Sequence, residues 1–503
     1  MTTLFLTVYF ALFSVLSIFG LHRYFITYLY AKNKGRKPEA APFESIPENE
    51  LPFVTVQLPI YNERYVAPRL IEAVSRLEYP KDKLEIQVLD DSTDETTAIV
   101  RELVERYQRE GFQMVLIHRE NRSGYKAGAL NEGLSQMRGS LVAVFDADFV
   151  PTADFLKKTV PHFIGRPKIG MVQVRWDHLN RDFSLLTQTQ SVFLDGHFML
   201  EHTARNRSGR FFNFNGTAGI WQRECIQSSG GWHCDTLTED LDLSYRAQLA
   251  GWQFIFLNDV VSPAELPVDL NAFKTQQHRW AKGSIQTARK LVPVILKSKF
   301  PLKVKVEALF HLCANFGYVC MLLVSILMPF SIYLRHHLHW GRLFIVDVPF
   351  FLSATFSVTF FYCYSQREIY ADWLSRLKYL PFNLALGIGL SVNNSKAVIE
   401  ALFSQRGEFT RTPKYAVIKK GDLWKGKIYR GRLDFVSFVE LALAIHFTIA
   451  VLYAFQQKLY LSLPFLMIFQ AGYAYTALLS FYQSEKFSHF LPLLRFSPQT
   501  TDK

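Results

Sequence analysis

Two acids two positions apart, Asp146 and Asp148, follow a short apolar run at 141–145 that is rich in valine. Such a run is typical of a strand buried on both faces. Side chains two apart on a strand point the same way, so the two carboxylates would repel each other unless a positive group lay between them. A hard divalent cation such as Mg²⁺, carried in on substrate phosphates, would satisfy both. An isolated pair of this kind is more simply a helix cap beside a solvated acid, so the other motifs must decide.

Polar side chains follow other predicted strands in the same way. Five short apolar runs rich in β-branched residues lie at 54–60, 84–89, 113–118, 141–145 and 169–174. Helical periodicity between them, as at 97–109 and 153–163, predicts an α/β domain with a parallel sheet and helices on both faces. Ligands of such sheets bind beyond the carboxyl ends of the strands. Glu63 and Asp91 come directly after the first two runs, so the sequence predicts a site at this edge.

Two further motifs carry groups that suit the transfer of a phosphate-linked substrate. Lys126, in a Gly-Tyr-Lys-Ala-Gly stretch that opens a helix, suits a diphosphate, although a solvated lysine is the simpler interpretation. Asp240, in Thr-Glu-Asp at 238–240, suits a general base that takes a proton from an acceptor hydroxyl. The same three residues also suit a helix start capped by Thr238, and both interpretations stay open.

A fifth motif, Gln-Gln-His-Arg-Trp at 276–280, is the most specific single piece of the chain. The guanidinium of Arg279 can neutralise a departing diphosphate, and the ring of Trp280 can stack on a sugar. The alternative is a basic interfacial helix with an aromatic anchor.

The composition places part of this chain in a membrane. Of its 503 residues 49% are hydrophobic, and several apolar runs reach the length of about 20 residues that crosses a bilayer. The net charge of +12 comes from basic residues beside these runs, which favours a cytoplasmic membrane face over a nucleic-acid partner. The five cysteines form neither a disulfide framework nor a metal-ligand spacing.

The predicted organisation is a cytoplasmic catalytic domain joined to a bundle of about five transmembrane helices. The spans are predicted at 1–21, 308–334, 343–364, 435–455 and 459–481, with a cytoplasmic linker at 22–50, the catalytic domain at 51–300 and an interfacial helix at 380–404. Basic residues follow the first span and none precedes it, so the amino terminus is expected outside. The protein is thus expected to be a multi-pass protein of the inner or plasma membrane, or of the Golgi membrane in a eukaryote.

Taken together, the motifs identify a family. Asp91, the Asp-x-Asp pair, Thr-Glu-Asp and Gln-x-x-Arg-Trp occur here in the order and at spacings similar to those of the inverting, membrane-embedded processive glycosyltransferases of the cellulose synthase superfamily, glycosyltransferase family 2. The residues within these motifs are most similar to those of the cellulose-synthase-like A group, the mannan and glucomannan synthases. The resemblance implies a GT-A-type, Rossmann-like fold for the catalytic domain.

The resemblance also implies a role for each matching residue. The nucleotide-sugar donor would be bound by Tyr61, Glu63, Asp91, Lys126 and Asp146; Mg²⁺ or Mn²⁺ by Asp148 with Asp146 beside it; the acceptor by Phe214, Asn215 and Trp280. The catalytic set would be Asp240, Glu239, Gln276, Arg279 and Trp280, and a gating-type loop at 405–415 would use Phe409, Thr412 and Lys414. Bacterial cellulose synthases differ at Gln277, Asn215 and Arg411, which leaves the donor sugar open.

The implied activity is polymerisation of a β-linked polysaccharide, mannan, glucomannan or glucan, from GDP-mannose or from UDP- or GDP-glucose, with extrusion across the membrane. The implied partners are the donor, the growing glycan and membrane lipid; no nucleic acid is expected, and an export partner is left open. One alternative is a non-processive enzyme that adds a single sugar to a lipid. Another is a transporter or scaffold with a decayed enzyme domain. Glu440, in the fourth predicted span, is interpreted either as lining the glycan path or as a residue satisfied by a neighbouring helix.

Overall fold

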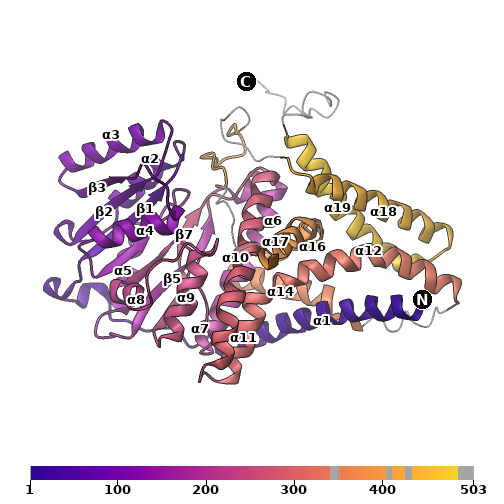
Figure 1. Ribbon diagram of the computed structural model, residues 1–503. Helices are drawn as coiled ribbons and strands as arrows, with labels where there is room; N and C mark the ends of the chain where they lie inside the picture. Colours follow the sequence, from indigo (N-terminus) through magenta and orange to yellow (C-terminus); the bar gives the residue numbers. More distant parts are fainter. Residues whose placement is uncertain are drawn as a thin grey trace.

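The structure is a computed structural model that describes residues 2–339, 349–350, 352–403, 411–424, 427 and 433–484. A part built around a β-sheet occupies one side of the molecule and a bundle of long helices the other, and α10 (Leu270–Lys297) stands between them (Figure 1). The chain starts in the bundle, at the end farthest from the sheet (Figure 1). The catalytic motifs therefore lie in the sheet-containing part and at its junction with the bundle.

The sheet has seven strands in the order β3-β2-β1-β4-β6-β5-β7. The strands are β1 (Val54–Ile60), β2 (Leu84–Asp90), β3 (Gln113–His118), β4 (Leu141–Val144), β5 (Ile169–His178), β6 (Gly219–Gln222) and β7 (Gln253–Ala264). β6 runs antiparallel to β4 and β5, whereas the other pairs are parallel. The prediction of an α/β domain of GT-A type is confirmed, but the sheet is mixed and not parallel, and the prediction missed β6. The reason is that β6, four residues long, returns between two strands and is too short to show a pattern.

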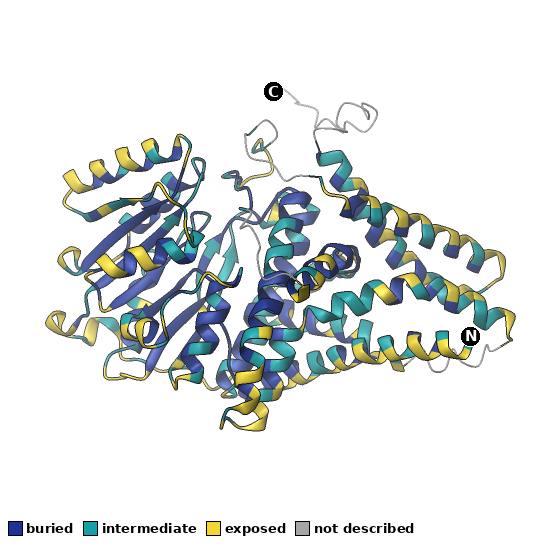
Figure 2. Cartoon of the chain, viewed as in Figure 1, coloured by how far each residue is buried: buried dark blue, intermediate teal, exposed yellow. Residues whose placement is uncertain are grey.

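Helices cover both faces of the sheet, because successive side chains of its buried strands point to opposite sides. Alternate residues such as Val56 and Ala143 pack with α2 (Ala67–Ser75), α3 (Thr96–Arg109) and α5 (Phe155–Thr159). Their neighbours, such as Val142 and Val144, pack with α4 (Tyr125–Gln136), α8 (Arg223–Ser228) and α9 (Glu239–Leu249). The strands are accordingly buried along most of their length (Figure 2).

The first helix is longer than the sequence predicts. α1 (Thr2–Asn33) continues through the first part of the predicted linker at 22–50. Its second half carries Ile26, Leu29 and Tyr30, which pack against the catalytic part through Met199 and Leu200. The helix therefore extends beyond the apolar span, because packing against the catalytic part stabilises its last three turns.

The predicted span at 308–334 is divided in the structure. α11 (Leu302–Cys313) ends before Asn315, and α12 (Phe316–His337) forms the long apolar helix. α11 holds Glu307 and His311 towards the polar side chains of Arg205 and Tyr245. It thus packs on the catalytic part, and only α12 keeps the length of a span.

The remaining helices differ less from the predictions. The interfacial helix predicted at 380–404 is two helices, α16 (Leu380–Gly389) and α17 (Ser391–Phe403), which meet at Leu390. The last two predicted spans correspond to α18 (Val436–Gln456) and α19 (Leu463–Gln483). Part of the span predicted at 343–364 lies outside the described residues; its described portion forms the π-helix Leu352–Phe356 and the start of α14 (Ser357–Ile369).

Four helices of the described ranges are long and apolar enough to cross a membrane: Thr2–Asn33, Phe316–His337, Val436–Gln456 and Tyr460–Gln483. Large apolar side chains of these helices are exposed, among them Ile18, Ile445 and Ile449. Exposed positions recur along the long helices of the bundle (Figure 2). Such a surface is expected against lipid and is unfavourable in water.

Candidate functional site

One cavity lies beyond the carboxyl ends of β1, β2 and β4, at the edge of the sheet that the sequence predicts. It brings together residues that are up to 355 positions apart in the sequence, from Pro59 to Lys414. The predicted site residues that line it are Tyr61, Glu63, Asp91, Lys126, Asp146, Asp148, Asn215, Glu239, Asp240, Gln276, Arg279, Trp280, Thr412 and Lys414.

Two predicted site residues are not placed there. Phe214 is fully buried, and its ring packs against Trp221 with centroids 5.5 Å apart. The adjacent Asn215 lines the cavity, because neighbouring residues of an extended segment point to opposite sides. The side chain of Phe214 therefore belongs to the core and not to an acceptor site. Phe409, predicted in the gating-type loop, lies outside the described residues.

Two lysines neutralise the acids at the centre of the cavity. The Nζ of Lys414 lies 2.7 Å from Asp148 Oδ1 and 2.9 Å from Glu63 Oε1. The Nζ of Lys126 lies 2.6 Å from Asp146 Oδ1. Burial raises the pKa of Asp148 despite the charge of Lys414, whereas the charge of Lys126 outweighs burial and lowers the pKa of Asp146. Lys414 thus bridges Glu63 and Asp148, whereas Asp146 is paired with Lys126. Carboxylate oxygens are the ligands that a hard divalent cation prefers.

The far end of the cavity holds Asp91 and Tyr61. Asp91 accepts two hydrogen bonds from Arg119, with distances of 2.7 Å to Nε and 2.5 Å to Nη2. The guanidinium of Arg122 lies 3.4 Å from the centre of the Tyr61 ring. These two arginines are missing from the predicted site. Arg119 follows directly after β3, and ligands of such sheets bind beyond the carboxyl ends of the strands. Its position in the sequence could therefore have indicated that it belongs to the site.

Asp240 is the acid with the most unusual environment. Burial first, and the charge of Glu239 second, raise its pKa to about 7. Its Oδ1 accepts a 2.8 Å hydrogen bond from the backbone N–H of Leu241, at the start of α9. Gly216 has a φ of +82°, and a Cβ there would lie 3.0 Å from Asp240 Oδ2. The turn at Gly216 therefore brings backbone close to the acid, and a larger residue would crowd it.

α10 supplies the Gln-x-x-Arg-Trp side chains. Gln276, Arg279 and Trp280 are spaced i, i+3 and i+4, so they lie on one helix face, and that face lines the cavity. The ring of Trp280 lies 6.5 Å from that of Trp176. The described part of the predicted gating-type loop begins at Arg411 and lines the same cavity. Arg411 donates hydrogen bonds to the carbonyl oxygens of Tyr61 and Asn62.

A second cavity, of about 960 Å³, opens from the first. The two share Trp176, Asn215, Asp240, Gln276 and Trp280 in their linings. The second continues between α1, α12, α14 and α16 to Arg335, near the end of α12, and to Tyr460, before α19. The volume is at the upper end of the range of ordinary ligand pockets. Glu440 lines neither cavity: its Oε2 lies 2.5 Å from Nζ of Lys274. The interpretation of Glu440 as part of a glycan path is therefore wrong.

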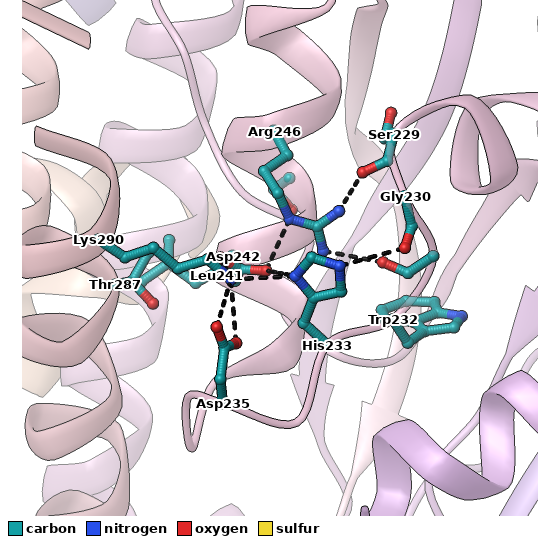
Figure 3. Close-up of polar contacts among 12 residues, drawn as sticks. Ser229, Gly230, Trp232, His233, Asp235, Leu241, Asp242, Arg246, Thr287 and Lys290 are labelled. Atoms are coloured by element: carbon teal, nitrogen blue, oxygen red, sulfur yellow. Dashed lines mark hydrogen bonds and ion pairs between the residues drawn. The ribbon is translucent and has the colours of Figure 1, made fainter. Parts of the chain in front are cut away.

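A further cluster has the composition of a metal site but the contacts of a structural one (Figure 3). His233, Asp235 and Asp242 converge, but the Nζ of Lys290 already lies among them, 3.0, 2.8 and 2.9 Å from Nδ1, Oδ2 and Oδ1, respectively. The Nε of Arg246 lies 2.8 Å from the other oxygen of Asp242. The two positive side chains balance the two carboxylates in charge, so these ion pairs themselves tie α9 to α10.

Comparisons with known proteins agree with the motifs. Residues 52–283 match the family described as "Glycosyltransferase like family 2". Two proteins of Arabidopsis thaliana, "Probable glucomannan 4-beta-mannosyltransferase 10" and "Glucomannan 4-beta-mannosyltransferase 7", are 42% and 40% identical over 285 residues, which are 54% of this chain and 51% of each relative. The chain thus spans about half the length of the curated relatives it matches.

Similar solved structures are more distant. The structure of "Mannosyltransferase PcManGT from Pyrobaculum calidifontis in complex with GDP-Man and Mn2+" is 19% identical, with a TM-score of 0.49 over 78% of this chain and all of that one. The "Crystal structure of S. aureus TarS" is 16% identical, with a TM-score of 0.36 over 71% of this chain and 56% of that one.

The family match covers the sheet, the Asp-x-Asp pair, Thr-Glu-Asp and the first half of α10, including Gln-x-x-Arg-Trp. The resemblance to family 2 that the motifs predict is therefore confirmed. Residues 52–283 form a glycosyltransferase family 2 domain, which this chain joins to helices long and apolar enough to cross a membrane.

Proposed function

We propose that the chain is an inverting β-hexosyltransferase that adds mannose or glucose from a nucleotide-diphosphate sugar to the end of a β-linked glycan. The observation that carries the proposal is the single cavity in which the predicted donor, base and leaving-group residues meet and from which a long second cavity opens. The printed names of the Arabidopsis relatives support mannan or glucomannan as the product.

Asp240 is the proposed general base. In its ionised form its Oδ2 takes the proton of the acceptor hydroxyl as that oxygen attacks the anomeric carbon from the side opposite the diphosphate. The bond between the anomeric carbon and the diphosphate oxygen breaks, and the configuration inverts. A pKa near 7 suits this role, because about half of the carboxyls are ionised at neutral pH and the base remains strong.

One unit of negative charge develops on the diphosphate as its bond to the anomeric carbon breaks, and this charge must be stabilised. Arg279 and Lys126 line the cavity on the side of Asp146 and supply positive charge to it. Asp148, with Asp146 beside it, is the proposed ligand of Mg²⁺ or Mn²⁺, because carboxylate oxygens are the ligands that such ions prefer. Such an ion, when bound, would neutralise charge on the donor phosphates.

We propose further that transfer is processive and coupled to export. The second cavity runs from Asp240 and Trp280 between helices that are apolar enough to cross a membrane. A glycan whose end lies at Asp240 would thread this cavity, and Trp176 and Trp280 would stack on its sugars. The catalytic domain would face the cytoplasm, where nucleotide-sugars and basic loops lie.

Membranes that contain the chain, supplied in parallel with radiolabelled GDP-mannose, GDP-glucose and UDP-glucose, test the proposal. Polymer that is degraded by a β-mannanase or β-glucanase is the expected product, and the cognate donor is the one that labels it. Label that appears only in the organic phase, on a lipid, would instead identify a non-processive transferase. The Asp240→Asn chain is the control for label made by other enzymes.

A further inference from the structure

A polar network occupies one wall of the second cavity just beyond Asn215. The Nδ2 of Asn215 lies 3.1 Å from Nε2 of His197, and the Nδ1 of His197 lies 3.0 Å from Oε2 of Glu201. Since the amide nitrogen can only donate, Nε2 of His197 accepts and Nδ1 carries the proton that it donates to Glu201. The network thus holds the imidazole of His197 between the amide of Asn215 and the carboxylate of Glu201.

His197 and Glu201 lie on the π-helix Gly196–His202. This π-helix directly follows α6 (Leu185–Asp195) and directly precedes α7 (Thr203–Arg207). π-Helical turns are rare and are frequent at functional sites. The turn holds both side chains towards the cavity, whose lining includes both.

Glu201 keeps one oxygen available. Its Oε2 accepts from His197 and lies 3.2 Å from Nη1 of Arg205, while Oε1 has no hydrogen bond to any residue that the structure describes. The Glu201 side chain is 27% exposed, although it lies inside the molecule, because it borders the cavity. Among the described residues that line this cavity, Glu201 and Asp240 are the only acids.

Glu201 is ionised at neutral pH. Burial would raise its pKa, but the charge of Arg205 and the hydrogen bond from His197 outweigh burial and hold the pKa well below its usual range. Arg205 is in turn fixed by Glu307 on α11, 3.0 Å from its Nε, and Glu307 lies 3.0 Å from Nε2 of His22 on α1. The carboxylate is therefore held in place by elements on three sides.

A fixed carboxylate with a free oxygen in a long cavity fits a hydroxyl-rich chain. An ionised acceptor forms stronger hydrogen bonds with hydroxyls than a neutral one. It would not suit a lipid chain, because an acyl chain offers no hydrogen-bond donor to the carboxylate oxygen Oε1, and an unsatisfied polar oxygen in an apolar environment is costly.

We propose that Glu201, held by His197 and Arg205, is a sugar-binding subsite of the glycan path that hydrogen-bonds hydroxyls of a sugar behind the terminal acceptor residue. This inference rests on the proposed function and adds a specificity-determining residue to it. The terminal sugar would lie at Asp240 and Asn215, and only an acceptor long enough to pass Asn215 would reach Glu201.

Acceptor length provides the test. Purified full chain in detergent is given the cognate donor and β-1,4-linked oligosaccharides of increasing length, and KM for each acceptor is measured. In the wild type, KM is expected to fall sharply at the length that reaches Glu201. In Glu201→Ala this fall is expected to be lost, so that KM for long acceptors rises on the order of tenfold, as for a lost charged hydrogen bond. KM for the shortest acceptors and for the donor is expected to stay unchanged.

Two further variants separate binding from folding. Glu201→Gln keeps the shape and one acceptor oxygen, so its KM for long acceptors is expected to lie between the other two values. Glu368→Ala is the matched control, because Glu368, like Glu201, is paired with a basic side chain and one further hydrogen-bond donor, here Lys34 and Tyr30, but lines neither cavity.

The outcomes are distinguishable. An equal loss at every acceptor length in Glu201→Ala would indicate a structural role and overturn the subsite. The subsite would also be overturned if KM of Glu201→Ala depended on acceptor length in the same way as KM of the wild type. A wild type that uses the donor but elongates no oligosaccharide of any length would overturn the proposed function, and the subsite with it.

Discussion

Asp240 lies where burial and a neighbouring carboxylate both disfavour its charged form. Asp240→Asn keeps the shape of the side chain but cannot accept a proton, so turnover is expected to fall by about 10²–10⁴-fold. Donor binding is expected to persist, because Lys126, Asp146 and Asp148 are unchanged. Turnover and nucleotide-diphosphate affinity, measured on the same preparation, check this. Turnover close to that of the wild type would remove Asp240 from the mechanism.

Glu239 offers a test of the same acid through pH. Asp240 must be ionised to act as a base, so kcat/KM is expected to fall as the pH drops through the pKa of Asp240, about 7 in the free chain. Glu239→Gln removes a negative charge that helps to raise that pKa, so the acid limb is expected to move to lower pH. The pH profile of kcat/KM measures the shift. Glu110→Gln, on a surface ion pair with Arg106, is the control and is expected to leave the limb in place.

At the scale of residues, sequence reasoning found the groups whose type is tied to chemistry. The acids of the motifs and Lys126, Arg279 and Trp280 line one cavity as a set. The partners Arg119 and Arg122 were missed because an arginine beside a strand end is common, and only tertiary structure aims it at Asp91 or Tyr61. The side chain of Phe214 was assigned by resemblance, which cannot tell the inward residue of an extended segment from its outward neighbour.

Among the elements, those with strong local patterns were predicted well. The bounds of β1 and β3 agree with the predicted 54–60 and 113–118. β6 has only four residues, and its place between β4 and β5 depends on contacts between residues far apart in the sequence. Gly219 pairs with Gln173, 46 positions away, and with Val144, 75 positions away. The boundary between α11 and α12 was missed for a related reason, because it is fixed by partners of Glu307 in distant elements.

The segment that carries Lys414 packs onto the donor side of the cavity, and its ammonium lies between Asp148 and Glu63. A divalent cation must compete with it for the same oxygens. Lys414→Met is therefore expected to raise the affinity for Mn²⁺ in the absence of nucleotide, by severalfold or more. Mn²⁺ titration followed by electron paramagnetic resonance measures this. Lys420→Met, an exposed lysine of the same segment, is the control. Weaker Mn²⁺ binding in Lys414→Met would contradict the competition.

α10 is fixed to the bundle by a buried ion pair. Nζ of Lys274 lies 2.5 Å from Oε2 of Glu440 on α18 and 2.7 Å from Oγ of Ser480 on α19. Glu440→Leu would leave the ammonium buried without its partner, at a cost of about 3–5 kcal/mol of stability. The double variant Lys274→Met with Glu440→Leu removes both charges and is expected to recover most of the loss. Thermal unfolding in detergent compares them. If the double variant unfolded at the same temperature as Glu440→Leu, the loss of stability would come from the absence of the ion pair and not from the unpaired charge of Lys274.

On the scale of the whole molecule, the sheet-containing part lies at one end of the long helices and the first residues of α1 at the other (Figure 1). The second cavity connects the two ends. Composition alone indicated a membrane protein with a catalytic domain on one side. The second cavity could not be predicted from the sequence. The residues that line it come from helices between α1 and α19, and no local sequence pattern shows that these helices meet.

The orientation of this assembly gives the last prediction. α18 and α19 each have 21 residues, about 30 Å of helix, which matches the hydrocarbon core of a bilayer. The exposed turn at Lys458 between them should therefore emerge on the side opposite the catalytic domain, and Lys420, in the segment that lines the donor cavity, on the same side as that domain. In a chain in which the native exposed Cys234 is replaced by serine, Lys458→Cys is expected to react with a membrane-impermeant maleimide on intact cells. Lys420→Cys is expected to react only after permeabilisation. Labelling of both from outside would contradict the proposed orientation, since the donor site would then lie away from cytoplasmic nucleotide-sugar.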